Sequence, residues 1–474
     1  MSHTEHLRDD QALTRIEKDL LGKQAVPATA LYGIQTQRAY QNFNITGVPI
    51  SHFPELIEAL AMVKSAAAKT NYHYDLLSKD KLTAITDACT DIINGEHHEQ
   101  FIVDLIQGGA GTSTNMNANE VIANIGLAKM GLAYGQYEYL HPNNDVNRSQ
   151  STNDVYPSAA RVAIVFAATP LKETIGKLQR SLMDKAEAFS GILKMGRTQL
   201  QDAVPMTLGQ EFHAFASDIG SEIAQIEQAC LQLCELNLGG TAIGTGINAP
   251  KGYGKLAISE LAEISGLPVR SAEDLIAASA DMGAFVAFSS MLKRLSIKLS
   301  KLSNDLRLLS SGPRTGFGEI NLPAMQPGSS IMPGKVNPVI PEAMNQAAFQ
   351  VIGTDMTVTM AAEAGQLQLN AMEPLIVYNL LNNTRLLDKS IRMLDELCVQ
   401  GITANDVRCA QHVENSIGIV TALVPHIGYE NASRIAGHAL LSGSGVAELV
   451  KQEKLLSDEE LAAILSPDTM VSSI

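Results

Sequence analysis

Residues 285–309 read FVAFSSMLKRLSIKLSKLSNDLRLL and carry a sustained apolar repeat. The spacings are 3, 4, 3, 4, 3, 4 and 3, and the repeat runs through Phe285, Phe288, Leu292, Leu295, Leu299, Leu302, Leu306 and Leu309. Such a repeat places one apolar stripe along a helix, and helices of this kind bury their stripes against one another. The stretch therefore predicts a long helix inside a bundle.

A second stripe of the same kind lies within residues 205–236. It runs through Phe212, Phe215, Ile219, Ile223, Ile226, Cys230 and Leu233. Further helical patterns cover residues 54–71, a segment after the N-cap candidate Ser78, and residues 253–265, 341–364 and 374–399. We therefore predict an all-α fold built on a central bundle of long helices.

Breakers and changes in helix length divide the chain into three predicted domains. Residues 1–149 begin with a loop-rich segment and continue into helices. Residues 150–401 contain the long-helix bundle. Residues 402–474 hold shorter helices, and the last of them begins with a capping box at Ser457.

Charge and cysteine content narrow the classes of function. The 474 residues include 35 lysines and arginines against 50 acidic residues, a net charge of −15. This balance argues against binding to nucleic acid or to an anionic membrane, and no apolar run reaches the length of about 18 residues that a membrane span needs. The five cysteines are scattered and odd in number, and no apolar segment follows the polar start at residues 1–10, so we expect a cytoplasmic protein.

One polar stretch, GSSIMPGKVNP at residues 328–338, is not explained by packing. Its two glycines and two prolines exclude a regular element, because glycine is free to take positive φ and each proline removes a backbone donor. The stretch contains the hydroxyls of Ser329 and Ser330, the ammonium of Lys335 and the amide of Asn337, and a helical run follows at once. Polar groups ahead of a helix N-terminus favour binding of an anion.

Three further polar stretches also precede helical runs, at residues 107–117, 149–154 and 196–199. A capped loop explains any one of them, and residues 107–117 lack the Gly-Lys-Ser/Thr of a phosphate-binding loop. Together the stretches hold more hydroxyls and amides than helix caps require. We therefore predict one site for a small polyanion. Arg38, an isolated cation in the loop-rich start, is a further candidate, and a solvated arginine is the alternative.

The residue types in these stretches limit the chemistry. The sequence shows no metal-ligand cluster, no dinucleotide glycine fingerprint after a strand and no Ser-His-Asp order. A general base then has to be a serine alkoxide, and Ser329 would need the positive potential of Lys335 and a helix N-terminus. Such a base suits removal of a carbon-bound proton beside a carboxylate, because preorganised donors then hold the resulting aci-carboxylate.

Residues 328–338 resemble the signature loop of the aspartase/fumarase superfamily, and residues 109–117 and 150–154 are similar to its other two motif regions. The similarity covers nearly the whole chain, and the block KMGRTQLQDAVP at residues 194–205 is most similar to the ammonia-lyase branch. The resemblance implies a three-domain all-α fold. It also implies a homotetramer whose central helices merge into one bundle and whose sites each take motif regions from three chains.

The resemblance further implies an activity and a set of site residues. The activity is reversible deamination of L-aspartate to fumarate and ammonia, by anti elimination through an aci-carboxylate, with no required cofactor; activation by a divalent cation is left open. Ser329 is implied as the general base. The implied substrate-binding residues are Thr112, Ser151, Thr152 and Ser330 at the β-carboxylate, Lys335 and Asn337 at the α-carboxylate, Asn153 and Thr198 near the amino group or that carboxylate, and Gln199.

Two departures from the superfamily bear on the reaction. Fumarases carry a histidine at the position of Gln199, paired with a glutamate expected at Glu342, and glutamine cannot titrate. A proton relay to water is therefore absent, which disfavours a hydratase and leaves Glu342 as a candidate without a clear role. Fumarases also carry aspartate at Asn144, so their accessory anion site is not expected. The alternatives are a class II fumarase acting on malate and a catalytically silent structural tetramer, the latter opposed by the intact Ser329 and Lys335.

Overall fold

The computed structural model describes residues 13–466, 469 and 471, so the polar start at residues 1–10 lies outside them. Contacts between Cα atoms group the chain into two compact units. Unit 1 comprises Met1–Pro170, Gln225–Leu292 and Gly353–Arg385, and unit 2 comprises Leu171–Ala224, Lys293–Ile352 and Leu386–Ile474. The division into three domains stays a prediction. The boundaries of the two units fall within long helices and not at the predicted domain boundaries.

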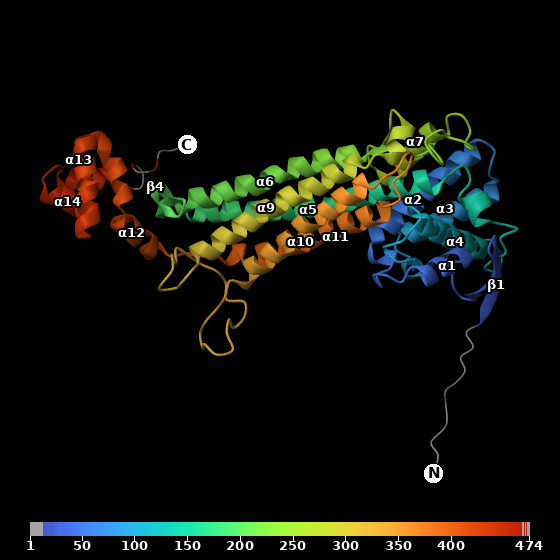
Figure 1. The fold of residues 1–474 in the computed structure, drawn as a ribbon, viewed down its shortest axis with the longest axis horizontal. Coiled ribbons are helices and arrows are strands. Elements are labelled where there is room, and N and C mark those ends of the chain that lie inside the picture. The colour runs from blue at the N-terminus through green and yellow to red at the C-terminus, as the bar shows by residue number, and fades with distance from the viewer. Residues whose placement is uncertain (1–12, 467–468, 470, 472–474) are drawn as a thin grey trace, which may run out of the picture. The chain divides into compact units, whose positions relative to one another are not determined.

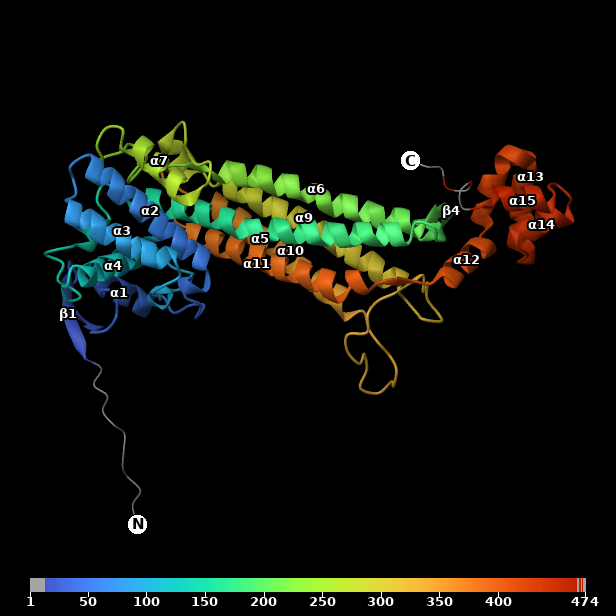
Figure 2. The same cartoon turned by 180° about the vertical axis from the view of Figure 1, so that it is seen from behind.

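The long helices of the predicted bundle each contribute one segment to unit 1 and another to unit 2. Within each unit these segments lie side by side in both views (Figures 1 and 2). The helices are α5 (Thr152–Ala188), α6 (Leu208–Leu233), α9 (Gly283–Leu309), α10 (Val339–Glu363) and α11 (Glu373–Leu397). The all-α fold class is therefore confirmed.

The apolar repeat that predicts the bundle is buried along its whole length. All eight of its side chains, from Phe285 to Leu309, are at most 5% exposed. Burying a side chain of this size stabilises the fold by about 1.5–3 kcal/mol, so the stripe contributes a large share of the packing energy of α9. In α6 the stripe is also buried, except that Ile223 is half-buried.

Unit 1 adds shorter helices around its segments of the long helices. Predicted helices are confirmed for α2 (Pro54–His73), α3 (Lys79–Ile93) and α7 (Tyr253–Ser265), and Ser78 caps α3 by accepting the N–H of Lys81. The other elements of unit 1 are β1 (Thr14–Asp19), β2 (Gly22–Pro27), α1 (Ile34–Asn42), η1 (Ile50–His52), η2 (His98–Gln100), α4 (Thr112–Lys129), η3 (Pro142–Val146), β5 (Glu235–Leu236), β6 (Arg270–Ser271) and α8 (Leu275–Ala280).

The prediction of a loop-rich start is wrong for residues 14–42. Strands β1 and β2 form an antiparallel hairpin there, and α1 follows. Helix α1 has no side-chain cap at Gly33, so the usual local signal of a helix start is missing. The groups that hold this segment come from distant parts of the chain.

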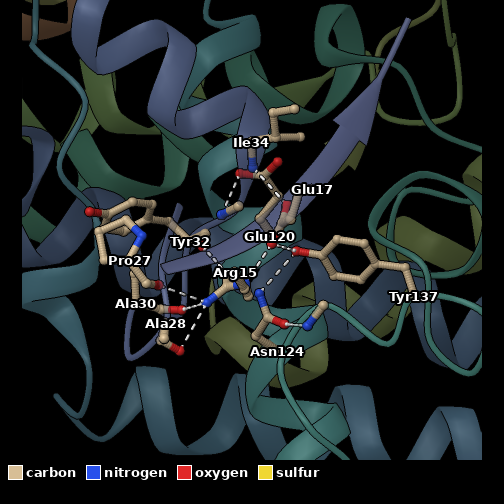
Figure 3. A network of polar contacts seen from close by, with 12 residues as sticks. Arg15, Glu17, Pro27, Ala28, Ala30, Tyr32, Ile34, Glu120, Asn124 and Tyr137 are labelled. Atoms are coloured by element: carbon tan, nitrogen blue, oxygen red, sulfur yellow. Dashed lines mark hydrogen bonds and ion pairs between the residues drawn. The ribbon is translucent and has the colours of Figure 1, made fainter. Parts of the chain in front are cut away.

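Figure 3 shows the polar network that supplies those groups. The carboxylate of Glu120, on α4, accepts the N–H groups of Gly33, Gln35 and Thr36 at 2.8–3.0 Å, and Glu17 accepts the N–H of Ile34 at 2.8 Å. These acceptors satisfy the donors at the start of α1. The guanidinium of Arg15 fixes the preceding loop by donating to the carbonyls of Pro27, Ala28, Ala30 and Tyr32.

Unit 2 ends in a cluster of short helices with its own apolar core. Met195, on β3, packs into this core together with residues of the last four helices. The predicted capping box at Ser457 is confirmed, because its side chain and that of Glu460 bond each other's backbone. The elements are β3 (Leu193–Thr198), β4 (Gln201–Thr207), β7 (Ile320–Asn321), η4 (Val399–Gly401), β8 (Thr403–Ala404), α12 (Asp406–Asn415), η5 (Ile417–Ile419), α13 (Val420–Ser442), α14 (Val446–Gln452) and α15 (Asp458–Ile464).

Among the described residues, no helix is both long enough and apolar enough to cross a membrane.

Candidate active site

The polar stretch at residues 107–117 opens into α4, which begins at Thr112 and not at the predicted Asn117. The cap residue Gly111 has φ +89°, and a Cβ there would lie 2.4 Å from the ring of Tyr156. Only glycine allows both this backbone and this approach. The amide of Asn117 is used elsewhere, since it accepts the N–H of Ile102 and donates to the carbonyl of Gln100.

The correction places the hydroxyls of this stretch in the first turn of α4. Thr112 is exposed there, and its hydroxyl donates to the carbonyl of Gly109 at 2.7 Å. The side chain of Asn115 reaches α5, where its Nδ2 donates to the hydroxyl of Thr152 at 3.0 Å. The N-termini of α4 and α5 therefore lie next to each other, and both helix dipoles favour an anion between them.

Helix α5 begins with a reciprocal cap. The hydroxyl of Ser151 accepts the N–H of Asn153 at 3.3 Å, and the carboxylate of Asp154 accepts the N–H of Ser151 at 2.9 Å. The other oxygen of Asp154 accepts the N–H groups of Gly239 and Thr241 at 2.9 and 3.0 Å. Burial raises the pKa of Asp154, and these N–H donors oppose the rise.

The glycine-rich turn at residues 239–242 is a part of this region that the sequence did not indicate as functional. Besides its bonds to Asp154, its Ala242 carbonyl accepts Nδ2 of Asn153 at 2.7 Å. Asn237, which precedes the turn, donates to the carbonyl of Asn153 at 2.9 Å. Two adjacent glycines are a weak signal in isolation, and only the bonds to α5 show what the turn does.

Lys64 is a second residue that no pattern in the sequence indicates as functional. Its side chain is completely buried in the apolar pattern of α2, and its ammonium donates to Asn147 at 2.8 Å and to Gln150 at 2.9 Å. Burial lowers the pKa of Lys64 to about 7, against the charge of Asp154. Asn147 also accepts from Asn115, so one buried cation supports both motif regions of unit 1.

A cleft of about 820 Å³ lies over these groups in unit 1. It is large enough for a small ligand. Its lining includes Gln150, Ser151, Thr152 and Thr241 together with Asn143, Asn144, Asn147 and Arg148. The cleft therefore brings together the start of α5, the glycine-rich turn and the segment around η3.

The stretch at residues 328–338 is an irregular loop, as predicted. The hydroxyl of Ser329 accepts the N–H groups of Ile331 and Met332 at 3.2 and 3.0 Å. Two bonds close the loop on itself: Gly328 N–H donates to the carbonyl of Lys335 at 2.7 Å, and Asn337 Nδ2 donates to the carbonyl of Gly328 at 2.8 Å. Donors aimed at a hydroxyl oxygen stabilise its alkoxide form.

The polar side chains of the loop differ in exposure. Ser330 and Lys335 are exposed, while Ser329 and Asn337 are partly buried. The candidate Glu342 lies beyond the loop, in the first turn of α10. The hydroxyl of Ser330 and the ammonium of Lys335 are therefore accessible from solvent.

The stretch at residues 196–199 forms the end of the hairpin between β3 and β4. Its turn residues Gln199 and Leu200 have φ +54° and +60°, which is the backbone of a type I′ turn. Thr198 and Gln199 are exposed at this turn. In both views the loop before α10, drawn in orange-yellow, extends away from the long helices (Figures 1 and 2).

Arg38 has a defined partner in unit 1. Its guanidinium makes two bonds to the carboxylate of Asp19, at 2.7 and 3.0 Å, and these bonds lower the pKa of Asp19. Arg38 also lines a hollow of about 430 Å³, together with Ser113 of the first motif region. A functional role of Arg38 stays a prediction.

The candidate residues thus fall into separate groups. Thr112, Ser151, Thr152 and Asn153 share the adjoining N-termini of α4 and α5 in unit 1. In unit 2, one group occupies the loop at residues 328–338 and another the β3–β4 turn. Their roles in catalysis stay predictions.

Comparisons with known proteins agree with this architecture. A family model described as "Lyase" matches residues 22–353, and one described as "Fumarase C C-terminus" matches residues 419–472. The fold and the motif regions define an all-α lyase, and the chain belongs to the aspartase/fumarase superfamily.

Named relatives place the chain within that superfamily. An aspartate ammonia-lyase of Pseudomonas aeruginosa is 62% identical over 462 residues, which cover 97% of this chain and 98% of the relative. An aspartate ammonia-lyase of Escherichia coli is 52% identical over 458 residues, with 96% of each chain covered.

Solved structures share the fold. A fumarate lyase:delta crystallin from Brucella melitensis, bound to cobalt, has a TM-score of 0.94 at 55% identity and covers 96% of this chain and 99% of its own. A class II fumarase from Schistosoma mansoni has a TM-score of 0.91 at 35% identity, with coverages of 97% and 99%.

Proposed function

We infer that the chain is an aspartate ammonia-lyase, a carbon–nitrogen lyase that interconverts L-aspartate with fumarate and ammonia. The observation that carries this inference is that the chain holds two adjoining helix N-termini in unit 1 and, in unit 2, a serine whose oxygen accepts two backbone N–H groups. Relatives that are 52–62% identical over nearly the whole chain carry that name.

Ser329 acts in this proposal as the general base. As an alkoxide it removes a proton from Cβ of aspartate, the pair of electrons moves into the neighbouring carboxylate, and ammonia then leaves from Cα. The N–H groups of Ile331 and Met332 stabilise the alkoxide, and the ammonium of Lys335, on the same loop, is proposed to add positive potential.

The β-carboxylate becomes the doubly charged aci-carboxylate and needs the most donors. Thr112, Ser151, Thr152 and Ser330 are the residues proposed for it, and three of them lie at helix N-termini. Donors fixed in place before the reaction stabilise developing charge most effectively. Lys335 and Asn337 are proposed for the α-carboxylate, with Asn153, Thr198 and Gln199 close to them.

The groups proposed for the site come from both units of the chain. We propose a homotetramer in which each site combines motif regions of three chains. Large apolar side chains on α10 support an assembly, because Phe349, Met356 and Met360 repeat at helical spacing and are 60–65% exposed. Exposed apolar patches of this kind mark interfaces between proteins.

No organic cofactor is required in this proposal, and the partners are L-aspartate and fumarate. The five buried cysteine thiols support a cytoplasmic location, because a reducing compartment keeps such thiols intact. Arg38 and Glu342 remain candidates, and the activity assay described next can test a role for each of them.

A direct assay tests the activity. Purified protein is mixed with L-aspartate or with L-malate, and the ultraviolet absorbance of fumarate is followed while released ammonia is measured separately. We expect fumarate and ammonia in equal amounts from L-aspartate. Fumarate from L-malate alone would identify a hydratase, and no product from either substrate would support a silent scaffold.

A further inference from the structure

Glu319 is a completely buried residue at the point where the chain enters the loop with Ser329. It directly precedes β7, which pairs with β8. Its N–H donates to the carbonyl of Leu309, and its carbonyl accepts the N–H of Asn405, both at 2.9 Å. The main chain is therefore fixed just before it leaves as the loop.

The carboxylate of Glu319 binds side chains from two other segments. Lys194 and Arg197, both on β3, lie 2.9 and 2.7 Å from it, and Nδ1 of His412, on α12, lies at 3.0 Å. Lys194 is 2% exposed and also pairs with Glu211 of α6. One carboxylate thus joins the β3–β4 hairpin, the start of the loop and α12.

Arg197 carries this connection to the candidate residues of the hairpin. It is the immediate neighbour of Thr198 along β3, and its guanidinium lies over the ring of Phe317 at 4.2 Å. Phe317 comes two residues before Glu319. Arg197 is therefore held both by the ring of Phe317 and by the charge of Glu319. These two contacts restrict the position of the neighbouring β3–β4 turn.

Charge, and not only shape, holds this cluster together. Burial alone raises the pKa of Glu319, but the charges of Lys194 and Arg197 outweigh it and hold the pKa below its ordinary value. Glu319 is therefore ionised at neutral pH. A glutamine of the same size would leave Arg197 without its anion and Lys194 with Glu211 alone.

We propose that Glu319 is a positioning residue for the elimination reaction, fixing the β3–β4 turn and the base of the Ser329 loop in one frame with α12. The proposal rests on the proposed function, because the groups that it positions are the candidate residues of that reaction. Glu319 itself does not touch the substrate. Displacement of a reacting group by about 1 Å lowers a rate by about 100-fold, so a loss of the frame is expected to lower kcat more than it raises KM.

The test compares Glu319→Gln with Glu222→Gln in the full-length protein. Glu222 is a matched control, since it is also completely buried and pairs with two cations, Lys298 at 2.6 Å and Arg294 at 3.0 Å, between α6 and α9. The measurements are kcat and KM for L-aspartate, the thermal midpoint, and hydrogen–deuterium exchange of residues 193–207 and 322–338.

We expect Glu319→Gln to lower kcat about 100-fold with KM within about threefold, and to speed exchange in both segments. Glu222→Gln should lower the thermal midpoint without either effect. His412→Ala provides a milder test, because His412 is partly exposed and its loss removes only the link to α12; its kcat should fall roughly tenfold, as for one lost bond to a charged group.

The proposal is overturned if Glu319→Gln keeps kcat within threefold, if its two segments exchange as slowly as in the wild type, or if Glu222→Gln loses as much kcat. Should Glu319→Gln fail to fold, an unchanged kcat in His412→Ala overturns it. Wild-type protein without activity on L-aspartate refutes the proposed function instead, and the exchange measurement then decides whether the frame exists.

Discussion

The candidate groups of unit 1 and those of the loop at residues 328–338 are held in opposite ways. In unit 1, the buried carboxylate of Asp154 accepts three backbone N–H groups, and the buried ammonium of Lys64 supports the side chains beside it. In the loop, Lys335 is exposed, and Ile331 is 83% exposed. The loop is shaped mainly by bonds within itself.

This difference assigns distinct tasks to the two regions. A rigid set of donors suits the binding of a carboxylate, because donors that are already in place need no reorganisation as charge develops. An exposed loop with few outside contacts suits a part that closes over bound substrate. We expect binding of the β-carboxylate to depend mainly on unit 1 and removal of the proton to depend on the loop.

The largest effect is expected from Ser329→Ala. Removal of a general base lowers kcat by about 10²- to 10⁴-fold, whereas the helix N-termini of unit 1 remain to bind a dicarboxylate. The rate of fumarate formation measures the loss of kcat. Calorimetric titration with a non-reactive dicarboxylate measures whether binding is retained. Retention of most activity would show that the base is a different group, and loss of ligand binding would show that the hydroxyl of Ser329 itself holds the ligand.

A pair of glycine variants tests how the loop is shaped. A Cβ on Gly328 would lie 2.7 Å from the carbonyl oxygen of Lys335 and 2.8 Å from the nitrogen of Asn337, whereas a Cβ on Gly334 meets open space. Gly328→Ala should lower kcat/KM by about 10- to 100-fold, because it displaces the loop. Gly334→Ala should cost the loop only about 1 kcal/mol through its φ of +82°.

Equal kcat/KM values for the two glycine variants would show that the bonds closing the loop do not matter for catalysis. Circular dichroism of both variants serves as the control, since neither glycine lies in a helix or strand.

Asp154→Asn tests the rigid set of hydrogen-bond donors in unit 1. Asparagine keeps the size of the side chain but replaces one acceptor oxygen by an NH₂ group that faces backbone donors. The loss of such a bond costs about 1–3 kcal/mol, so we expect a lower thermal midpoint and a roughly tenfold higher KM. A fall in kcat with an unchanged KM would contradict the division of tasks between the two regions.

The smallest effect on activity is expected from Glu373→Gln, which changes a buried side chain within unit 1. Glu373 is 1% exposed, and among the described residues neither of its carboxylate oxygens accepts a hydrogen bond. Burial raises its pKa to about 8, opposed by the charge of Arg161. A raised pKa in the folded state means that its stabilisation is complete below the pKa of the unfolded chain and is lost as pH rises towards 8.

Wild-type protein should therefore lose stability between pH 5 and 8 with a slope of up to about 1.4 kcal/mol per pH unit from this group. Glu373→Gln should lack that slope and keep its activity at neutral pH. Thermal midpoints measured across this range decide the matter, and parallel curves for the two proteins would show that Glu373 is ionised in the folded state.

Local patterns in the sequence predicted much of the fold. The 3, 4 repeat of α9, the cap at Ser78 and the capping box at Ser457 are each set by residues within a few positions of one another. The prediction of a loop-rich segment is wrong for residues 14–42, and α1 has no local cap because Glu120 and Glu17 cap it from outside. The true start of α4 was likewise hidden, since Gly111 is fixed by the ring of Tyr156.

The sequence by itself determined the all-α bundle, the superfamily and the polar stretches, because these depend on periodicity and on short motifs. Only the tertiary structure decided that α4 and α5 start side by side, that Lys64 and Asp154 support them, and that Glu319 joins β3, β7 and α12. The physical reason is that a buried charge is stable only beside its partners, and those partners come from parts of the chain that lie far apart in sequence.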